Sequence, residues 1–306
     1  MNSKIQEEFR QLGFGMFIHY NMATYTGEKW VTGYPEPSTF NPGKSIDTDA
    51  WADAAASAGM TYGVLTAKHV GGFCLWDSKH TDYGVMHPHC SYQQDLVRQF
   101  VDSFTSHGLK VGLYYCWRNP GFDDGEGNEG KFKVLPPECD PSITSLEEQI
   151  DFQQKQIREL ADMFPEVFYI WNDALDPRII PEEQAKHFVT SLGRELLSCG
   201  NWWDWAMKGE PYLDLLISEM KQLPEGNTVP GETCWTLEDG WFWSEGTPTT
   251  DPENILKRLN AANDRNANFL LNVGPDKTGQ ITPESLIALK RLGEMRKSSS
   301  TNEVNP

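Results

Sequence analysis

The sequence predicts an α/β fold, a single (β/α)8 TIM-like barrel, from three observations. Apolar, β-favouring runs of strand length alternate with amphipathic helical patterns through most of the 306 residues. Several of these runs end abruptly on a histidine or a carboxylate. The chain is long enough to bury one large core, and no linker divides it. We therefore expect one barrel domain over residues 1–297, irregular in its second half, and a disordered tail over 298–306.

The first half of the chain is the more regular half. Its predicted strands are 14–19, 62–67, 109–117 and 167–173. Two predicted helices cover residues 47–58 and 94–107. A third helical pattern ends at Pro165, and a fourth begins at Pro181. Glycines at 59 and 108 are typical helix stops. Each strand is thus followed by a loop and a helix, as a parallel barrel requires.

The second half gives weaker signals. Strands are expected over 213–219, 230–235 and 267–274. Asp251 followed by Pro252 predicts a helix start, and Thr282 followed by Pro283 predicts a closing helix. The span from Cys199 to Trp235 leaves little room for full crossover helices, so this part of the barrel is expected to be irregular.

Charge and hydropathy limit the possible partners. The 26 Lys and Arg residues face 44 acidic ones, a formal charge of -18, which disfavours a polyanion such as nucleic acid. Neither a signal peptide nor a membrane-spanning run is visible, so the sequence predicts a cytoplasmic protein without a membrane partner, unless a leader has been removed.

The six cysteines are far apart and form no C-x-x-C pair, so they are expected to be reduced thiols rather than zinc ligands or a disulfide framework.

Polar and aromatic side chains collect at the predicted strand ends. They are His19, His69, Tyr115, Trp117, Trp171, Asp173, Glu219 and Glu232. The carboxyl ends of barrel strands face the active site, so these side chains are candidates for one site. Two carboxylates among histidines and tryptophans are what glycoside hydrolysis needs, one as the nucleophile and one as the acid.

Metal chemistry is the main alternative to glycoside hydrolysis. His87 and His89 form an H-x-H pair, but they lie in a proline-containing loop after the second strand, where a surface position is expected. His19, His69 and Asp173 could together bind a cation, although no sequence spacing supports it. We expect no metal and no cofactor.

Several motifs, in order, resemble the retaining α-L-fucosidases of glycoside hydrolase family 29. They are Gly15-Met16-Phe17-Ile18-His19, Leu65-Thr66-Ala67-Lys68-His69, Gly72-Phe73-Cys74-Leu75-Trp76-Asp77-Ser78, Gly112-Leu113-Tyr114-Tyr115, Ile170-Trp171-Asn172-Asp173 and Asn268-Phe269-Leu270-Leu271-Asn272-Val273-Gly274-Pro275. The resemblance extends from about Phe14 to Met295. It implies the catalytic barrel. We expect a barrel-only enzyme without the C-terminal β-sandwich that many members carry, because the sequence ends soon after the closing helix.

The resemblance also implies residue roles. Asp173 would be the nucleophile, and the acid/base would be Glu219 or, as an alternative, Glu232; Asp214 is a third choice. The substrate-binding residues would be His19, Glu28, Trp30, His69, Tyr115 and Trp171. Trp30 and Trp171 could equally be packing residues, and both glutamates have structural alternatives.

The chain departs from the family pattern at several places. Val70 and Gly71 stand where many members have a second histidine and an aspartate. Ala174 stands where glycine is common, and Asn172 replaces an aromatic or small residue. Tryptophan occurs around 201–204, where many members place a sugar-binding arginine. These differences bear on which sugar and linkage are accepted more than on the reaction.

The expected function is therefore that of a retaining exo-acting α-L-fucosidase, with fucosylated glycans as substrates and possible transfucosylation. The alternatives are a carbohydrate-binding barrel with weak or no catalysis, a glycosidase for a fucose-like sugar, and a metal-dependent hydrolase. The natural glycan and any homo-oligomer are left open by the sequence.

Overall fold

The computed structural model describes residues 4–28, 31, 33–117, 143, 145–175, 180–201 and 211–302. Its strands are β1 (Phe14–Ile18), β2 (Tyr62–Lys68), β3 (Lys110–Cys116), β4 (Val167–Asp173), β5 (Leu197–Asn201), β6 (Leu216–Glu219), β7 (Gly231–Thr236) and β8 (Ala267–Val273). Its helices are α1 (Lys4–Arg10), α2 (Met22–Thr26), the short η1 (Pro37–Thr39), α3 (Thr48–Ser57), α4 (Leu96–Ser106), α5 (Leu146–Met163), α6 (Glu182–Ser191), α8 (Pro252–Asn263) and α9 (Pro283–Asn302).

The eight strands are parallel and confirm the predicted barrel. Their order is β5-β4-β3-β2-β1-β8-β7-β6. The first and last strands of this order meet through an isolated bridge between Cys199 and Leu215. The Asp214 carboxylate strengthens this seam, because it accepts a 2.8 Å hydrogen bond from the Ser198 amide. Asp214, the third candidate for the acid/base, is thus engaged in closing the barrel.

One strand was missed by sequence reasoning. The strand β5 has the sequence Leu-Ser-Cys-Gly-Asn, which lacks β-branched and aromatic residues and therefore has little β-propensity. It pairs with β4 over its whole length, so its neighbours in the sheet rather than its own residues determine its conformation. The irregularity expected after it is present, since residues 220–230 join β6 to β7 without a helix.

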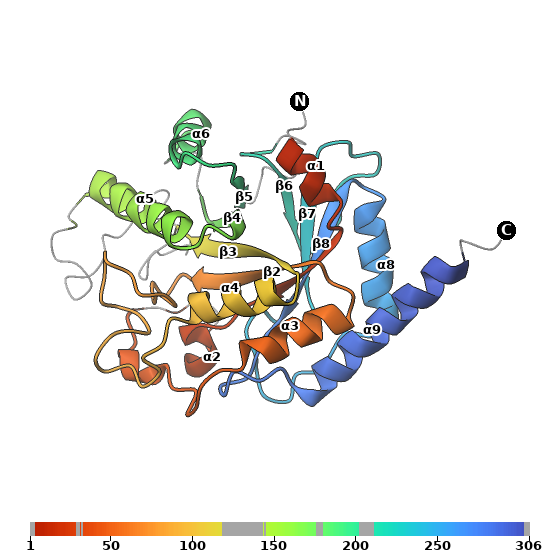
Figure 1. The fold of residues 1–306 in the computed structure, drawn as a ribbon, viewed down its shortest axis with the longest axis horizontal. Coiled ribbons are helices and arrows are strands. Elements are labelled where there is room, and N and C mark those ends of the chain that lie inside the picture. The colour runs from red at the N-terminus through yellow and green to blue at the C-terminus, as the bar shows by residue number, and fades with distance from the viewer. Residues whose placement is uncertain are drawn as a thin grey trace, which may run out of the picture.

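Alternate residues of each strand face two separate cores. Phe17, Tyr114 and Trp171 belong to the cluster that fills the barrel interior. Leu65, Leu113 and Ile170 belong to the larger cluster between the strands and the helices. Figure 1 shows α3, α4, α8 and α9 side by side along the outside of the barrel.

The N-terminal helix α1 closes the end of the barrel where the strands begin. Phe9 of α1 is fully buried, and its ring lies 5.8 Å from that of Tyr62 and 5.3 Å from that of Tyr169. The Asn268 side chain donates a 2.8 Å hydrogen bond to the Phe9 carbonyl. Because this end is filled, the opposite, carboxyl end of the strands is the one that remains for a site.

Helix ends follow the sequence signals closely. Ser145 and Glu148 form a capping box at the start of α5, and Asp251 caps α8 with Pro252 in its first turn. The last helix, α9, continues to Asn302, beyond the boundary expected at residue 297.

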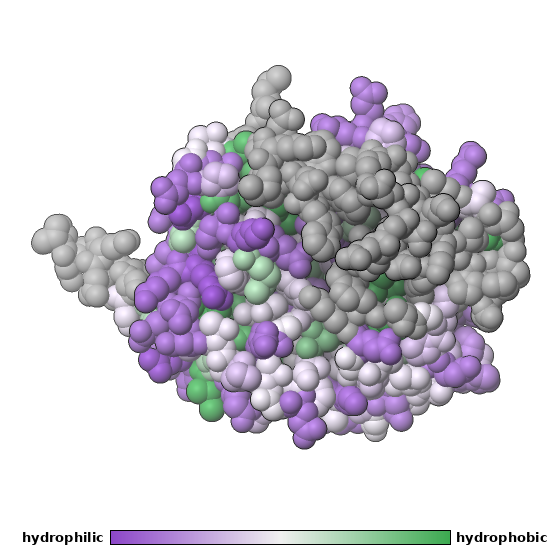
Figure 2. All heavy atoms as spheres, turned by 180° about the vertical axis from the view of Figure 1, so that it is seen from behind, coloured by the Kyte–Doolittle hydropathy of each residue, from purple (hydrophilic) through white to green (hydrophobic). Residues whose placement is uncertain are grey.

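The outer surface of the described residues is largely polar. On the side shown in Figure 2, hydrophilic and neutral residues cover most of the coloured surface, and apolar residues form small, separate spots. The large apolar side chains that are exposed are Met86, Met220, Leu286 and Ile287. In the described part of the chain, no helix is both long and apolar enough to cross a bilayer.

Candidate active site

The predicted site residues meet where the barrel strands end. His19 follows β1, His69 follows β2, Asp173 is the last residue of β4, and Glu219 is the last residue of β6. All eight strands are parallel, so these positions lie at the same end of the barrel. The structure therefore brings these four predicted residues to one end of the barrel.

Both oxygens of Asp173 are held by hydrogen bonds. The Tyr114 hydroxyl donates to Oδ2 at 2.6 Å. The Asn201 side chain donates to Oδ1 at 2.9 Å, and the Ala174 backbone amide donates to the same oxygen at 2.8 Å. Asp173 is half-buried, so a carboxylate with a fixed orientation remains partly accessible.

The backbone takes an unusual conformation after each carboxylate at the strand end. Ala174, next to Asp173, has φ 53°, and Met220, next to Glu219, has φ 54°. These are left-handed values that residues with a Cβ adopt at a cost of about 1 kcal/mol or more. At Ala174 this turn lets the backbone amide reach back to Asp173.

Glu219 is linked to Asp173 through one amide group. The Asn201 nitrogen that donates to Asp173 also donates to Glu219 Oε2, at 3.1 Å. The two acceptor oxygens are therefore at most about 6 Å apart, since both are hydrogen-bonded to the same atom. Glu219 itself is exposed, as a group that must reach a substrate should be.

His19 is buried and fixed. Its Nδ1 forms a 2.6 Å hydrogen bond with Oδ1 of Asn272, whose amide nitrogen in turn donates to the Trp241 carbonyl. Burial, and then the nearby His69, lower the pKa of His19 well below its usual value, although the Asn272 hydrogen bond opposes the shift. A neutral ring that donates from Nδ1 presents Nε2 as an acceptor, which suits a sugar hydroxyl.

Aromatic rings surround both histidines. His69 is stacked on Tyr114 with ring centroids 5.6 Å apart. Phe242 meets His69 at 4.9 Å and His19 at 5.3 Å, and Trp241 lies 5.0 Å from His19. Sequence reasoning missed Trp241 and Phe242, although a Gly-Trp-Phe-Trp run soon after a predicted strand was an available signal.

Tyr115 does not lie at the site, because it is on the opposite face of β3. Its hydroxyl donates to Gln156 of α5 at 2.7 Å and accepts from the buried Lys68 ammonium at 3.1 Å. The inward residue is Tyr114, the one that donates to Asp173. The prediction was displaced by one residue, and in a strand such a displacement moves the side chain to the other face.

Glu232 is located deep inside the barrel rather than at a strand end. It is the second residue of β7 and is completely buried. It accepts hydrogen bonds from the Tyr62 hydroxyl at 2.5 Å, the Trp171 indole at 2.9 Å and the Tyr169 hydroxyl at 3.1 Å. Burial raises its pKa to about 7, although these three donors oppose the shift.

Trp171 belongs to this same interior layer. It lies two residues before Asp173 on β4 and is buried. Its ring is stacked on Tyr114 at 5.5 Å, so it supports the tyrosine that holds Asp173. Of the remaining predicted contacts, Glu28 is exposed just after α2, and Trp30 lies outside the described residues.

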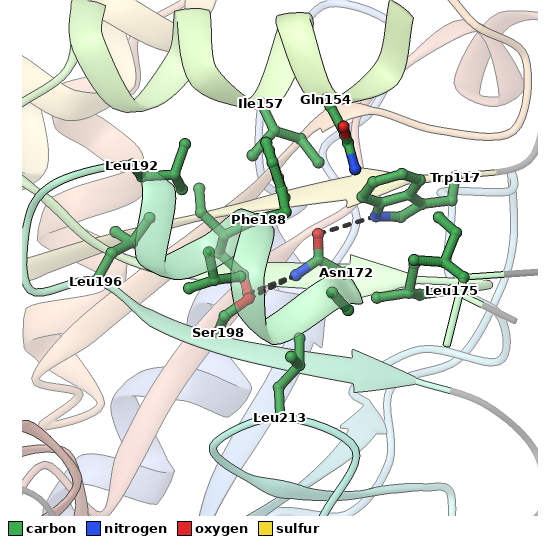
Figure 3. Close-up of a pocket in the computed structure, with 14 residues that line it drawn as sticks. Trp117, Gln154, Ile157, Asn172, Leu175, Phe188, Leu192, Leu196, Ser198 and Leu213 are labelled. Atoms are coloured by element: carbon green, nitrogen blue, oxygen red, sulfur yellow. Dashed lines mark hydrogen bonds between the residues drawn. The ribbon is translucent and has the colours of Figure 1, made fainter. Parts of the chain in front are cut away.

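Asn172, one of the departures from the family pattern, points away from the barrel interior. Its side chain bridges the Trp117 indole at 2.9 Å and the Ser198 hydroxyl at 2.8 Å. Figure 3 shows this polar bridge in a small cavity between α5 and α6, among Ile157, Leu175, Phe188, Leu192, Leu196 and Leu213. The cavity lies between strands β4 and β5 on one side and helices α5 and α6 on the other, and Asp173 is not among its lining residues.

No group of three or more potential metal ligands gathers anywhere in the part of the chain that the structure describes. The rings of His87 and His89 lie 5.0 Å apart on an exposed loop.

Comparisons with known proteins identify the family of this chain. The family model for alpha-L-fucosidase matches residues 1–299. Alpha-L-fucosidase 1 of Arabidopsis thaliana is 27% identical over 323 residues, covering 96% of this chain and 60% of that protein. The human plasma alpha-L-fucosidase is 25% identical, covering 94% of this chain and 66% of that protein. This chain thus spans about 60% of the length of the Arabidopsis relative.

Solved structures share the fold. Alpha-L-fucosidase isoenzyme 1 from Paenibacillus thiaminolyticus superposes with a TM-score of 0.79 at 26% identity, over 97% of this chain and 76% of that one. The alpha-L-fucosidase AlfC from Lactobacillus casei, solved in complex with alpha-L-fucose, gives a TM-score of 0.79 at 21% identity, over 98% of this chain and 100% of that one.

Proposed function

Because this chain belongs to the alpha-L-fucosidase family, glycoside hydrolase family 29, we propose that it is a retaining exo-acting α-L-fucosidase. It releases terminal α-L-fucose from glycans through a covalent fucosyl-enzyme intermediate.

The single observation that carries this proposal is the separation of Asp173 and Glu219. Their linked oxygens are at most about 6 Å apart, near the ~5–5.5 Å of retaining glycosidases and short of the ~6.5–9.5 Å of inverting ones. The shorter spacing leaves no room for a water between the carboxylate and the sugar. Asp173 therefore attacks the anomeric carbon directly.

The two steps use the same pair of groups. In the first step a bond forms between an Asp173 oxygen and the anomeric carbon, the glycosidic bond breaks, and Glu219 gives its proton to the departing oxygen. In the second step Glu219, now a carboxylate, takes a proton from water, and the resulting hydroxide displaces Asp173. An acceptor sugar in place of that water would give transfucosylation.

Glu219 suits the acid/base role better than Glu232. Glu219 is exposed at the strand end and shares a donor with Asp173. Glu232 is enclosed by three donors below Trp171, where no glycosidic oxygen can approach it. The raised pKa of Glu232 is therefore a consequence of its structural burial.

The rings around the histidines account for the choice of sugar. Nε2 of His19, a neutral ring, accepts from a sugar hydroxyl, and the ring of His69 lies 5.8 Å from that of His19. Trp241 and Phe242 form an apolar wall next to both histidines. Fucose carries a methyl group where most hexoses carry a hydroxymethyl group, and an apolar wall favours that methyl group.

The decisive experiment is hydrolysis of 4-nitrophenyl α-L-fucopyranoside by the wild type and by Asp173→Gly, with and without azide. We expect turnover by the wild type, a loss of several orders of magnitude in the variant, and partial rescue by azide. The rescued product should be the inverted β-fucosyl azide, because azide enters from the face that Asp173 occupied. Asp264→Gly, at an exposed position after α8, is the matched control and should keep wild-type activity.

Other outcomes separate the alternatives. A wild type that binds fucose but turns over no fucoside, from aryl fucosides to fucosylated oligosaccharides, would leave a carbohydrate-binding barrel. Activity that disappears with EDTA and returns with a divalent cation would favour a metal-dependent hydrolase.

A further inference from the structure

Asn201 occupies the position between the two carboxylates. It is the last residue of β5, directly opposite Asp173 in the register with β4. On its other side β5 meets β6, which ends on Glu219. The side-chain nitrogen of Asn201 has two hydrogens, and it donates to Asp173 at 2.9 Å and to Glu219 at 3.1 Å.

A shared donor affects both groups in the same direction. A hydrogen bond to a carboxylate stabilises its ionised form relative to its protonated form. Catalysis by the proposed mechanism needs Asp173 ionised but Glu219 protonated in the first step. The Asn201 amide therefore favours the ionised Asp173 that the first step needs and disfavours the protonated Glu219. These two effects together determine the pH range in which Asp173 is ionised while Glu219 is protonated.

We propose that Asn201 is a positioning residue that sets the pH range of the Asp173–Glu219 pair by hydrogen-bonding both carboxylates through one amide. This inference rests on the proposed retaining mechanism.

The same amide also helps the second step. Once Asp173 carries the sugar it is a neutral ester, and an ester oxygen is a weaker hydrogen-bond acceptor than a carboxylate. Glu219 has by then become a carboxylate and is the better acceptor of the two. Asn201 thus stabilises Glu219 in its basic form at the stage where it must activate water.

Other titratable groups surround the pair and must be kept constant in any test. They are His19 after β1, His69 after β2, Tyr114 and Cys116 on β3, Cys199 on β5, and Glu232 and Cys234 on β7. A substitution confined to Asn201 leaves all of them in place. A change in the pH profile can therefore be attributed to the lost amide.

The test is the pH dependence of kcat/KM for Asn201→Ala and for the isosteric Asn201→Asp. Loss of the donor favours protonation of both carboxylates, so both limbs of the bell-shaped profile should move to higher pH, by about one unit in Asn201→Ala. Asn201→Asp adds a negative charge and should move them further. Asn260→Ala, at an exposed position on α8, is the matched control and should leave the profile unchanged.

A second measurement does not depend on turnover. Carbon-13 NMR titration of labelled carboxyl groups, assigned with Asp173→Asn and Glu219→Gln, should show the midpoints of the pair rising in Asn201→Ala. Lower activity with unmoved limbs and unmoved midpoints would overturn the role of Asn201 and leave the fucosidase proposal intact. Absence of wild-type turnover would instead overturn the function, while the titration would still decide whether Asn201 controls the pair.

Discussion

Two glutamates on neighbouring strands of this barrel have opposite environments. Glu219 ends β6 and is exposed, whereas Glu232 is the second residue of β7 and is fully buried. In the register between these strands Glu232 lies opposite Ile217, two residues below Glu219. Two residues span about 7 Å along a strand. This distance is enough to place Glu219 at the open end of the barrel and Glu232 in its interior.

The difference shows that position along the strand decides what a carboxyl group can do. At the mouth, Glu219 shares a donor with Asp173 and is exposed. In the interior, Glu232 accepts hydrogen bonds from two buried tyrosine hydroxyls and a buried indole. The first group is expected to matter for catalysis and the second for stability.

The largest expected difference is in kcat, between two variants in which one of these glutamates is replaced by glutamine. Glu219→Gln should lower kcat about 10²- to 10⁴-fold on fucosides with poor leaving groups, because the proton donor is lost, with little change in stability. Glu232→Gln should keep kcat within a few-fold of the wild type. Kinetics on a fucosyl disaccharide and on an aryl fucoside with a good leaving group measure this.

The product formed with azide makes this comparison sharper. An acid/base variant should give the retained α-fucosyl azide, since azide attacks the fucosyl-enzyme in place of activated water. If Glu232→Gln gave that product and Glu219→Gln did not, the two roles would be reversed.

The next effect is on the pH dependence of stability. The pKa of Glu232 is raised from 4.5 to about 7, so between these values the folded protein keeps a proton that the unfolded chain has lost. The contribution of Glu232 to the free energy of unfolding is therefore fully present below pH 4.5. About 3 kcal/mol of it is lost as the pH rises from 4.5 through 7. Urea unfolding at pH 4.5, 6 and 8 measures the loss.

Glu232→Gln is the reference for that measurement, because it removes the titration and keeps the shape. Subtracting its unfolding free energy from that of the wild type also cancels His19, whose lowered pKa acts in the opposite direction. If the unfolding free energies of the wild type and Glu232→Gln changed equally with pH, the prediction would be contradicted.

A smaller effect distinguishes the two faces of β3. Tyr114→Phe removes the donor to Asp173 and should lower kcat/KM about 10- to 100-fold, since a hydrogen bond to a charged group is lost. Tyr115→Phe loses its contacts with Gln156 and Lys68 and should cost about 1–2 kcal/mol of stability with kcat unchanged. If Tyr115→Phe were the variant with impaired kinetics, the assignment of inward and outward faces would be wrong.

The smallest effect concerns the turn after Asp173. Ala174 adopts φ 53°, which glycine tolerates better, so Ala174→Gly should stabilise the protein by about 0.5–1 kcal/mol. Ala56→Gly, at an exposed position of α3, should instead destabilise it by about 0.5–1 kcal/mol. Thermal unfolding of the two variants compares them, and a shift of the same sign in both would contradict the strain at Ala174.

Local sequence determined much of this molecule. Strand β4 begins and ends where the apolar run does, at Val167 and Asp173, and α5 and α8 begin at the caps that their sequences provide. These features depend on short-range patterns of hydrophobicity and capping, which one sequence displays directly. The strand-end positions of His19, His69, Asp173 and Glu219 follow from the same patterns.

Tertiary structure decided the rest, because it depends on which strands pair and at what height. Strand β5 forms only because β4 lies beside it, and that pairing brings Asn201 between the two carboxylates. Strand register decides which of Tyr114 and Tyr115 faces the barrel interior, because a shift of one residue moves each side chain to the other face. Register also decides how deep Glu219 and Glu232 lie in the barrel. The Trp241 and Phe242 wall comes from a loop distant in sequence from His19 and His69. Such contacts join residues that no local pattern connects.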